Sequence, residues 1–156
     1  MKSLLLLLRF YYAASRLTEH LAPVFDLGLR LYLANVFFKS GLTKIQSWDS
    51  TLYLFSDVYQ VPLLSPDAAA YLATGAELGL PVLLVLGLFG RFAAAGLFIL
   101  NGVAVISYSE LSEAGINQHI SWGLLLGVLL LLSRGKWSAD FWLERYLLKS
   151  GSEHAL

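Results

Sequence analysis

Four polar side chains that could carry acid–base or hydrogen-bonding chemistry lie within apolar stretches: Glu77, Lys39, Asn101 and His119. Glu77 is the most unusual, because it interrupts the run AAAYLATGAELGLPVLLVLGLF, residues 68–89. That run is long enough to cross a bilayer as a helix, which takes about 20 residues. An ionised carboxylate in hydrocarbon costs about 3 kcal/mol or more, so it is normally neutral, paired or turned towards a wet cavity. The chemistry therefore depends on which side chains face Glu77.

Each of these side chains has a structural and a functional interpretation. Lys39 and Glu77 are expected either to form an ion pair that holds two helices together or, with His119, to bind a polar head group or relay protons. Asn101 is better explained by a hydrogen bond between helices. For His119, a solvated or capping histidine at a helix entry is the alternative. No His, Cys and carboxylate cluster has the spacing of metal ligands, so no metal site is predicted.

The composition points to a membrane protein. Apolar residues make up 57% of the 156 residues and charged residues 14%, and the apolar residues lie in long blocks. The net charge of zero argues against a nucleic-acid partner. With no cysteine, the chain offers no disulfide, thiol nucleophile or cysteine-ligated cluster, so any such chemistry belongs to a partner.

The apolar blocks predict an all-α membrane protein built as a four-helix up-down bundle. The turn at Gly90–Arg91 is so short that the two helices it joins must lie antiparallel. Residues 46–66 are too apolar for a loose connector and predict a short helix or lid on the outer surface. The bundle occupies residues 23–143, and residues 144–156 form a cytoplasmic tail. The predicted spans are residues 25–45, 68–89, 92–108 and 119–133.

Residues 1–22 predict an interfacial amphipathic helix. The leucine run after Lys2 is short, and Arg9 and Arg16 follow it without a convincing cleavage site, unlike a signal peptide. A helix packed on the cytoplasmic side of the protein itself is the alternative. Pro23 is expected to end this helix, because proline lacks the backbone N–H that a helix interior needs.

Charge sets the predicted orientation. The N-terminal segment, the turn before Arg91 and the C-terminal segment carry most of the basic residues. The opposite side holds Lys39 and Lys44 beside five carboxylates, at Asp49, Asp57, Asp67, Glu110 and Glu113. The positive-inside rule then places both termini in the cytoplasm. Arg30, near the start of the first span, is expected to extend to the cytoplasmic interface.

This orientation places the polar side chains at overlapping depths. Glu77 lies roughly 15 Å inward from Asp67, at 1.5 Å per helical residue. Lys39 occupies the outer third of its span, Asn101 lies near mid-depth, and His119 enters from the outer side. We therefore expect these groups, which come from four helices, to converge on one pocket open to the outer face.

Three segments resemble the spans of DoxX-like proteins. RLYLANVFFKSGLTKI resembles the first span, ATGAELGLPVLLVLGLFGRFAA the second with its embedded Glu, and NQHISWGLLLGVLLLLSRGKWSAD the last with its entry His. The loop WDSTLYLFSDVYQVPLLSPDAAAYLAT resembles the HvfX-like branch, which is associated with maturation of copper-binding, ribosomally made, modified peptides. The chain departs from the pattern at RGKWS, where Gly-Pro-Gly is common, and at residues 109–117, which are longer and more acidic.

The resemblance implies a bacterial inner-membrane protein whose relatives include small subunits of quinone-linked sulfur oxidation. It also implies protein partners that are redox or peptide-modifying enzymes. Carried over by position, the family pattern marks Arg30, Gly41, Lys44, Glu77, Arg91, His119 and Asp140.

Three functions are consistent with these observations. The first is a redox-linked accessory subunit that binds a quinone or another lipophilic carrier, rather than a stand-alone enzyme. The second is a non-catalytic membrane anchor or assembly partner, in which the polar pairs are structural. The third is a small transporter or exporter component, for which four helices without a repeat would require a homo-oligomer.

Overall fold

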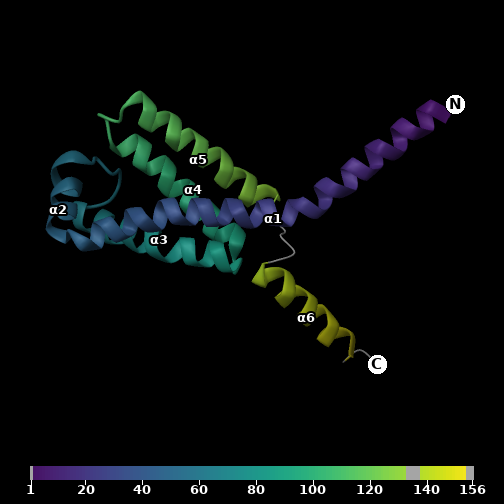
Figure 1. Cartoon of the computed structure of the whole chain (residues 1–156). Coiled ribbons are helices and arrows are strands. Elements are labelled where there is room, and N and C mark those ends of the chain that lie inside the picture. The colour runs from purple at the N-terminus through teal and green to yellow at the C-terminus, as the bar shows by residue number, and fades with distance from the viewer. Residues whose placement is uncertain (1, 133–137, 154–156) are drawn as a thin grey trace.

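The computed structural model describes residues 2–132 and 138–153, and the regular structure in these residues is helical. Four helices in this part of the chain are long and apolar enough to cross a membrane, and they pack lengthwise into a bundle (Figure 1). This confirms the predicted all-α, four-span bundle and fits a multi-pass membrane protein. The four helices are α1, Lys2–Gln46; α3, Pro66–Leu86; α4, Gly90–Ser107; and α5, Glu113–Leu132.

The bundle encloses one apolar core to which all four helices contribute. The side chains at its centre are less than a tenth exposed, and partly buried leucines pack around them. α5 contributes least, since 11% of its most apolar window is buried, against 33% for α3. Most of the surface of α5 is therefore apolar and faces outward. The core residues are Leu33, Phe37, Leu84, Ala93, Ala94, Leu97, Leu126 and Leu129.

Gly41 sets the distance between α1 and α3. A Cβ atom at this position would lie 2.9 Å from the Leu78 side chain and 3.1 Å from the Cβ of Glu77. A residue with a side chain would push the two helices apart, so glycine allows the close approach that small residues give in membranes. The close approach places Glu77 directly against α1.

Two features fix the turn between α3 and α4, one at the end of α3 and one at the start of α4. Gly87 has a φ of +65° and ends α3 in the left-handed conformation that glycine adopts without penalty. The carboxylate of Asp140 accepts hydrogen bonds from Phe89 N at 2.9 Å and Gly90 N at 3.0 Å, and so caps the start of α4. Asp140 belongs to α6, Ala139–Glu153, which leaves the same end of the bundle as the N-terminal part of α1 (Figure 1).

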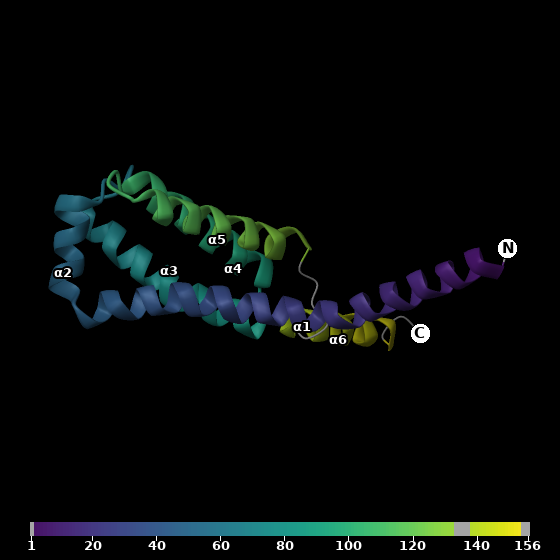
Figure 2. The same cartoon turned by 45° about the horizontal axis from the view of Figure 1, so that its top comes forward.

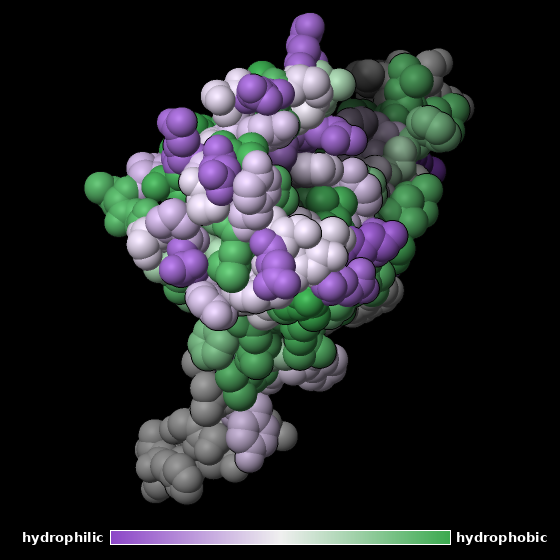
Figure 3. Space-filling view, turned by 90° about the vertical axis from the view of Figure 1, so that its left-hand side faces the viewer, coloured by the Kyte–Doolittle hydropathy of each residue, from purple (hydrophilic) through white to green (hydrophobic). Residues whose placement is uncertain are grey.

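The other end of the bundle is covered by a short helical segment. It consists of α2, Trp48–Tyr53, and the π-helix η1, Leu54–Val58, and α2 runs across the end of the bundle (Figure 2). Phe55 is buried there against Ala69 and Ala70 of α3. This confirms the predicted short helix. Figure 3 shows hydrophilic side chains gathered on this end of the molecule, above apolar sides.

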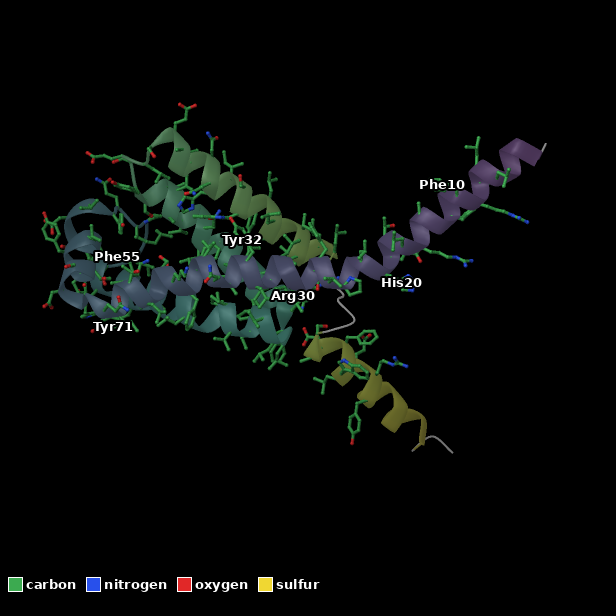
Figure 4. All side chains as sticks on the ribbon, in the orientation of Figure 1. Phe10, His20, Arg30, Tyr32, Phe55 and Tyr71 are labelled. Atoms are coloured by element: carbon green, nitrogen blue, oxygen red, sulfur yellow. The ribbon has the colours of Figure 1, made fainter. Side chains whose placement is uncertain are left out.

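The predicted break at Pro23 is wrong, because α1 continues through it as one helix. The part of α1 that carries Phe10 and His20 projects beyond the bundle (Figure 4). A proline inside a helix removes one hydrogen bond and bends the axis, but it does not have to end the helix. Residues 1–22 are therefore not a separate element, although their interfacial location stays a prediction.

The helix that contains the predicted fourth span is longer than that span at its start. α5 begins at Glu113, and Ser112 Oγ accepts a hydrogen bond from Gly115 N at 3.2 Å just before the first turn. A serine in this position is a common helix N-cap, and it lets polar residues start the helix. His119 therefore lies well inside α5. Ser133 and residues 154–156 lie outside the described residues, and the predicted tail boundary after residue 143 falls within α6.

Candidate functional site

Glu77 forms a closed polar cluster with two residues of α1. Lys44 Nζ lies 2.8 Å from Oε1 and 2.7 Å from Oε2, so the ammonium group pairs with both carboxylate oxygens. Ser40 Oγ donates to Oε1 at 3.1 Å and accepts from Lys44 Nζ at 2.9 Å. The Glu77 side chain is 10% exposed and that of Lys44 19%. The cluster satisfies the buried carboxylate and joins α1 to α3.

The predicted partner of Glu77, Lys39, is not part of this cluster. Lys39 is exposed, and Lys44 forms the ion pair in its place. Ser40 and Lys44 are four residues apart, so they lie on one helical face, whereas Lys39 is turned away from that face. Sequence reasoning missed Ser40, although its spacing of four from Lys44 was the available signal.

Tyr59, which follows η1, lies beside this cluster. Burial raises the pKa of the Tyr59 phenol above its ordinary value of 10.0, and the neighbouring Tyr108 and Glu77 raise it further. The rings of Tyr59 and Tyr108 meet edge-on with centroids 5.5 Å apart. At neutral pH the phenol therefore keeps its proton. The residue after the covering segment thus brings a neutral hydroxyl group close enough to Glu77 to be affected by its charge.

Asn101 and His119 form a second polar cluster, between α4 and α5. Asn101 Nδ2 donates to the backbone carbonyl of His119 at 2.9 Å. His119 Nδ1 lies 2.8 Å from Asn101 Oδ1. The predicted hydrogen bond from Asn101 between helices is therefore present, and two atoms of one amide make it a reciprocal pair.

The second cluster extends to α1 through aromatic side chains. His119 meets the Trp122 ring edge-on at a centroid distance of 5.0 Å. Trp122 Nε1 donates to the Tyr32 hydroxyl at 3.2 Å, and the Trp122 ring packs on Phe37. Tyr32 extends from the middle of α1 (Figure 4). These contacts hold one side of the imidazole in place.

An apolar groove runs along α4 and α5 from this second cluster. Its volume is about 690 Å³, and both Asn101 and His119 line it. From His119 to Leu132 the groove follows α5 for about 20 Å, at 1.5 Å per residue. Its other walls are almost entirely apolar, which is typical of a site that takes a hydrophobic molecule and orients it with a few polar groups. They include Phe98, Gly102, Val105, Ile120, Gly127 and Leu131.

The two clusters lie at the same depth but stay separate. Glu77 and Asn101 are each roughly 15 Å from the α3–α4 turn, near the middle of a 30 Å hydrocarbon core. Among the described residues, no hydrogen bond or ion pair joins Glu77 to Asn101 or His119. The side chains that were expected to share one pocket therefore lie at two separate sites. Within the described part of the chain, no group of three or more His, Asp or Glu side chains is arranged to hold a metal ion.

Arg30 and Asp140 belong to the end of the bundle from which α6 leaves. Arg30 is 3% exposed and pairs with Asp26 at 2.7 Å, so the expectation that it extends to the interface is wrong. Its guanidinium group packs so closely on Gly87 that a Cβ there would lie 2.5 Å from Nη1. Arg91 is exposed, and Asp140 caps α4. Arg30 and Asp140 therefore have structural contacts at this end of the bundle, and all three positions lie far from Glu77 along the helices.

Comparison with known proteins identifies the family. The DoxX family model matches residues 25–109. The chain belongs to the DoxX family. An uncharacterized protein of Haemophilus influenzae is 33% identical to it over 123 residues, which cover 72% of this chain and 78% of that protein. No solved structure matches the chain.

The residues that match the DoxX family include the Glu77 cluster but only part of the Asn101–His119 cluster. It includes Lys44 and Glu77, and so the whole ion pair, but it ends before His119. Of the second cluster, only Asn101 lies within the matched residues. The family match therefore describes the bundle that positions the groove, while one side of the groove comes from the part of the chain beyond it.

Proposed function

We propose that this DoxX protein is a membrane-embedded accessory subunit that holds a quinone or a similar lipophilic carrier for partner enzymes. The groove between α4 and α5 is the observation that carries the proposal. Its walls would take an apolar chain, and the Asn101–His119 pair at one end would orient a polar ring. A quinone combines these two parts, and a carrier that diffuses in the bilayer could enter from the side.

The proposal places the protein in a bacterial inner membrane with both termini in the cytoplasm. Both ends of the chain leave the same end of the bundle (Figure 1), and Arg9, Arg16 and Arg91 lie towards that end. Of the eleven basic residues in the sequence, two, Lys39 and Lys44, fall in the third of α1 nearest the covered end, and this scarcity agrees with the positive-inside rule. In this orientation the partner enzymes can meet the protein on the cytoplasmic side, at α6 and the projecting part of α1.

The partners that we propose are redox enzymes or enzymes that mature copper-binding modified peptides. The resemblance of residues 48–74 to the HvfX-like branch supports the second class. In either case the substrate chemistry takes place on the partner, while the DoxX subunit binds the carrier at mid-membrane depth and supplies it to that partner.

The test is titration of the purified full-length protein in detergent with a short-chain quinone analogue, in both oxidation states. We expect at least one state to bind saturably. Gly127→Leu should abolish binding, because a Cβ at Gly127 meets nothing within 4 Å and a leucine there can fill the groove. Lys39→Ala, on an exposed side chain, is the matched control. Absence of binding in both states, or equal binding by the Gly127 variant, would remove the proposal.

A second function, a non-catalytic anchor that assembles peptide-modifying enzymes, is favoured by the Lys44–Glu77–Ser40 cluster. All three side chains bond to one another, which suits a structural lock between α1 and α3. If this is the main function, partner enzymes should co-purify with the protein in mild detergent and remain active when the groove is blocked by Gly127→Leu. Loss of partner activity in that variant, with co-purification intact, would favour the carrier role.

A further inference from the structure

The reciprocal bonds between Asn101 and His119 fix where the hydrogens lie. A backbone carbonyl can only accept, so the amide group that faces the carbonyl of His119 at 2.9 Å is Nδ2. Oδ1 of the same amide then faces the imidazole, 2.8 Å from Nδ1. Because Oδ1 also can only accept, Nδ1 must carry the hydrogen.

This arrangement leaves Nε2 of His119 as an acceptor. An imidazole is mostly neutral at pH 7, and with its hydrogen on Nδ1 it presents a lone pair on Nε2. The neighbouring donor, Trp122 Nε1, already bonds to Tyr32. Among the described residues no donor to Nε2 is found, and His119 lines the groove. A hydroxyl group at this end of the groove would supply the donor that Nε2 lacks.

We infer that the groove selects a lipophile whose head group is a hydroxyl and that, for a quinone-type carrier, it prefers the reduced quinol. The O–H of a quinol can donate to His119 Nε2, and its chain can lie along the walls formed by Gly102, Gly127 and Leu131. An oxidised quinone carries only acceptor oxygens, so it would leave Nε2 without a partner. This inference rests on the proposed carrier function and adds the chemical form of the ligand.

A transmembrane helix is the other occupant that such a groove could take. Gly123 and Gly127 have the spacing at which small residues let helices pack. An apolar helix in the groove, however, would offer Nε2 no donor, and burying an acceptor without a donor is unfavourable. The second cluster therefore favours a hydroxyl-bearing molecule over a second helix.

The experiment uses the full chain in detergent and titrates it calorimetrically, under anaerobic conditions, with decylubiquinol and decylubiquinone. The quinol should bind at least tenfold more tightly. Unlabelled 1-dodecanol, which has a hydroxyl and no redox chemistry, should compete with it. His119→Leu should lower quinol affinity at least tenfold and change quinone affinity less than threefold. Asn101→Leu should reduce the preference, because the ring is then free to place its hydrogen on Nε2.

The outcomes separate this inference from the proposed function. Equal affinities, or tighter binding of the quinone, would overturn the inference and leave the carrier function standing. Binding of neither form would remove both. If His119→Leu does not fold, the preference of the unmodified protein and the competition by 1-dodecanol decide the question without it.

Discussion

The two polar clusters at mid-depth differ in whether their hydrogen-bonding capacity is used up. Between α1 and α3, the carboxylate of Glu77 accepts bonds from Lys44 and Ser40, and these two side chains also bond to each other. Between α4 and α5, Asn101 and His119 satisfy each other only on one side of the imidazole ring. The ring also lines a groove of about 690 Å³.

The difference shows that an ionisable residue in a membrane helix is not by itself the functional group. Glu77 is the most conspicuous residue of the sequence, yet its neighbours neutralise and satisfy it. His119 is less conspicuous, yet it lines the groove, and no donor to its Nε2 is found among the described residues. We therefore propose that the first cluster holds the bundle together and that the second carries the function.

Breaking the closed cluster should produce the largest effect. Glu77→Leu leaves Lys44 buried without a counter-charge. Lys44→Met leaves the carboxylate of Glu77 buried without a counter-charge. Each should lower the free energy of unfolding by about 3 kcal/mol, whereas the double variant should recover most of that loss, since an apolar pair can replace a buried ion pair. SDS titration of the protein in mixed micelles measures these free energies.

The double variant also gives the result that would contradict this interpretation of the ion pair. If Lys44→Met with Glu77→Leu is as unstable as either single variant, the cluster contributes more than a paired charge. Ser40→Ala is the milder control, because it removes one donor to Oε1 and leaves the ion pair in place.

Asn101→Leu should have a smaller effect on stability than either single charge variant. It removes two hydrogen bonds between α4 and α5, which in a membrane are together worth about 1–2 kcal/mol. The same SDS titration measures the loss. A loss as large as that of Glu77→Leu would mean that the second cluster is also a structural lock, which would weaken the contrast between the two.

Asp140→Ala shows how much stability is lost when a polar contact outside both clusters is removed. It removes the cap from the first turn of α4, which should cost about 1 kcal/mol. Limited proteolysis should cut the junction before α6 faster in this variant. Glu144→Ala, on an exposed position of the same helix, should leave the cleavage rate unchanged.

Lys39→Ala should have the smallest effect. Its side chain is exposed, so the free energy of unfolding should change by less than about 0.5 kcal/mol. A loss comparable to that of Lys44→Met would show that the ion pair alternates between the two lysines, and would contradict the assignment of Lys44 as the partner.

The sequence predicted four membrane-spanning helices because hydropathy over about 20 residues distinguishes a helix that lies in hydrocarbon from one that lies in water. It did not predict the partner of Glu77, because pairing depends on which face of α1 meets α3. The buried positions Arg30, Leu33, Phe37 and Gly41 recur every three or four residues, and Lys44 continues that series. Lys39 falls outside this series. The partner of Glu77 therefore follows from the face of α1 on which each lysine lies, and not from its depth in the membrane.

The length of the helix that carries His119 was not predicted from the sequence for a different reason. The predicted fourth span begins at residue 119, after the polar residues Glu113 to Gln118, although Ser112 is a typical cap for a helix that starts before them. The groove could not be predicted at all, because it depends on how far apart α4 and α5 lie along their length. Its polar end, by contrast, consists of two residues that the sequence had singled out, Asn101 and His119.

One titration tests the division of roles most directly: the affinity of decylubiquinol for two variants of the full-length protein. The double variant Lys44→Met, Glu77→Leu should bind within about threefold of the unmodified protein, because the groove does not involve these residues. His119→Leu should bind at least tenfold more weakly. The reverse result, in which the double variant loses binding and His119→Leu keeps it, would place the site at Glu77 and contradict the account.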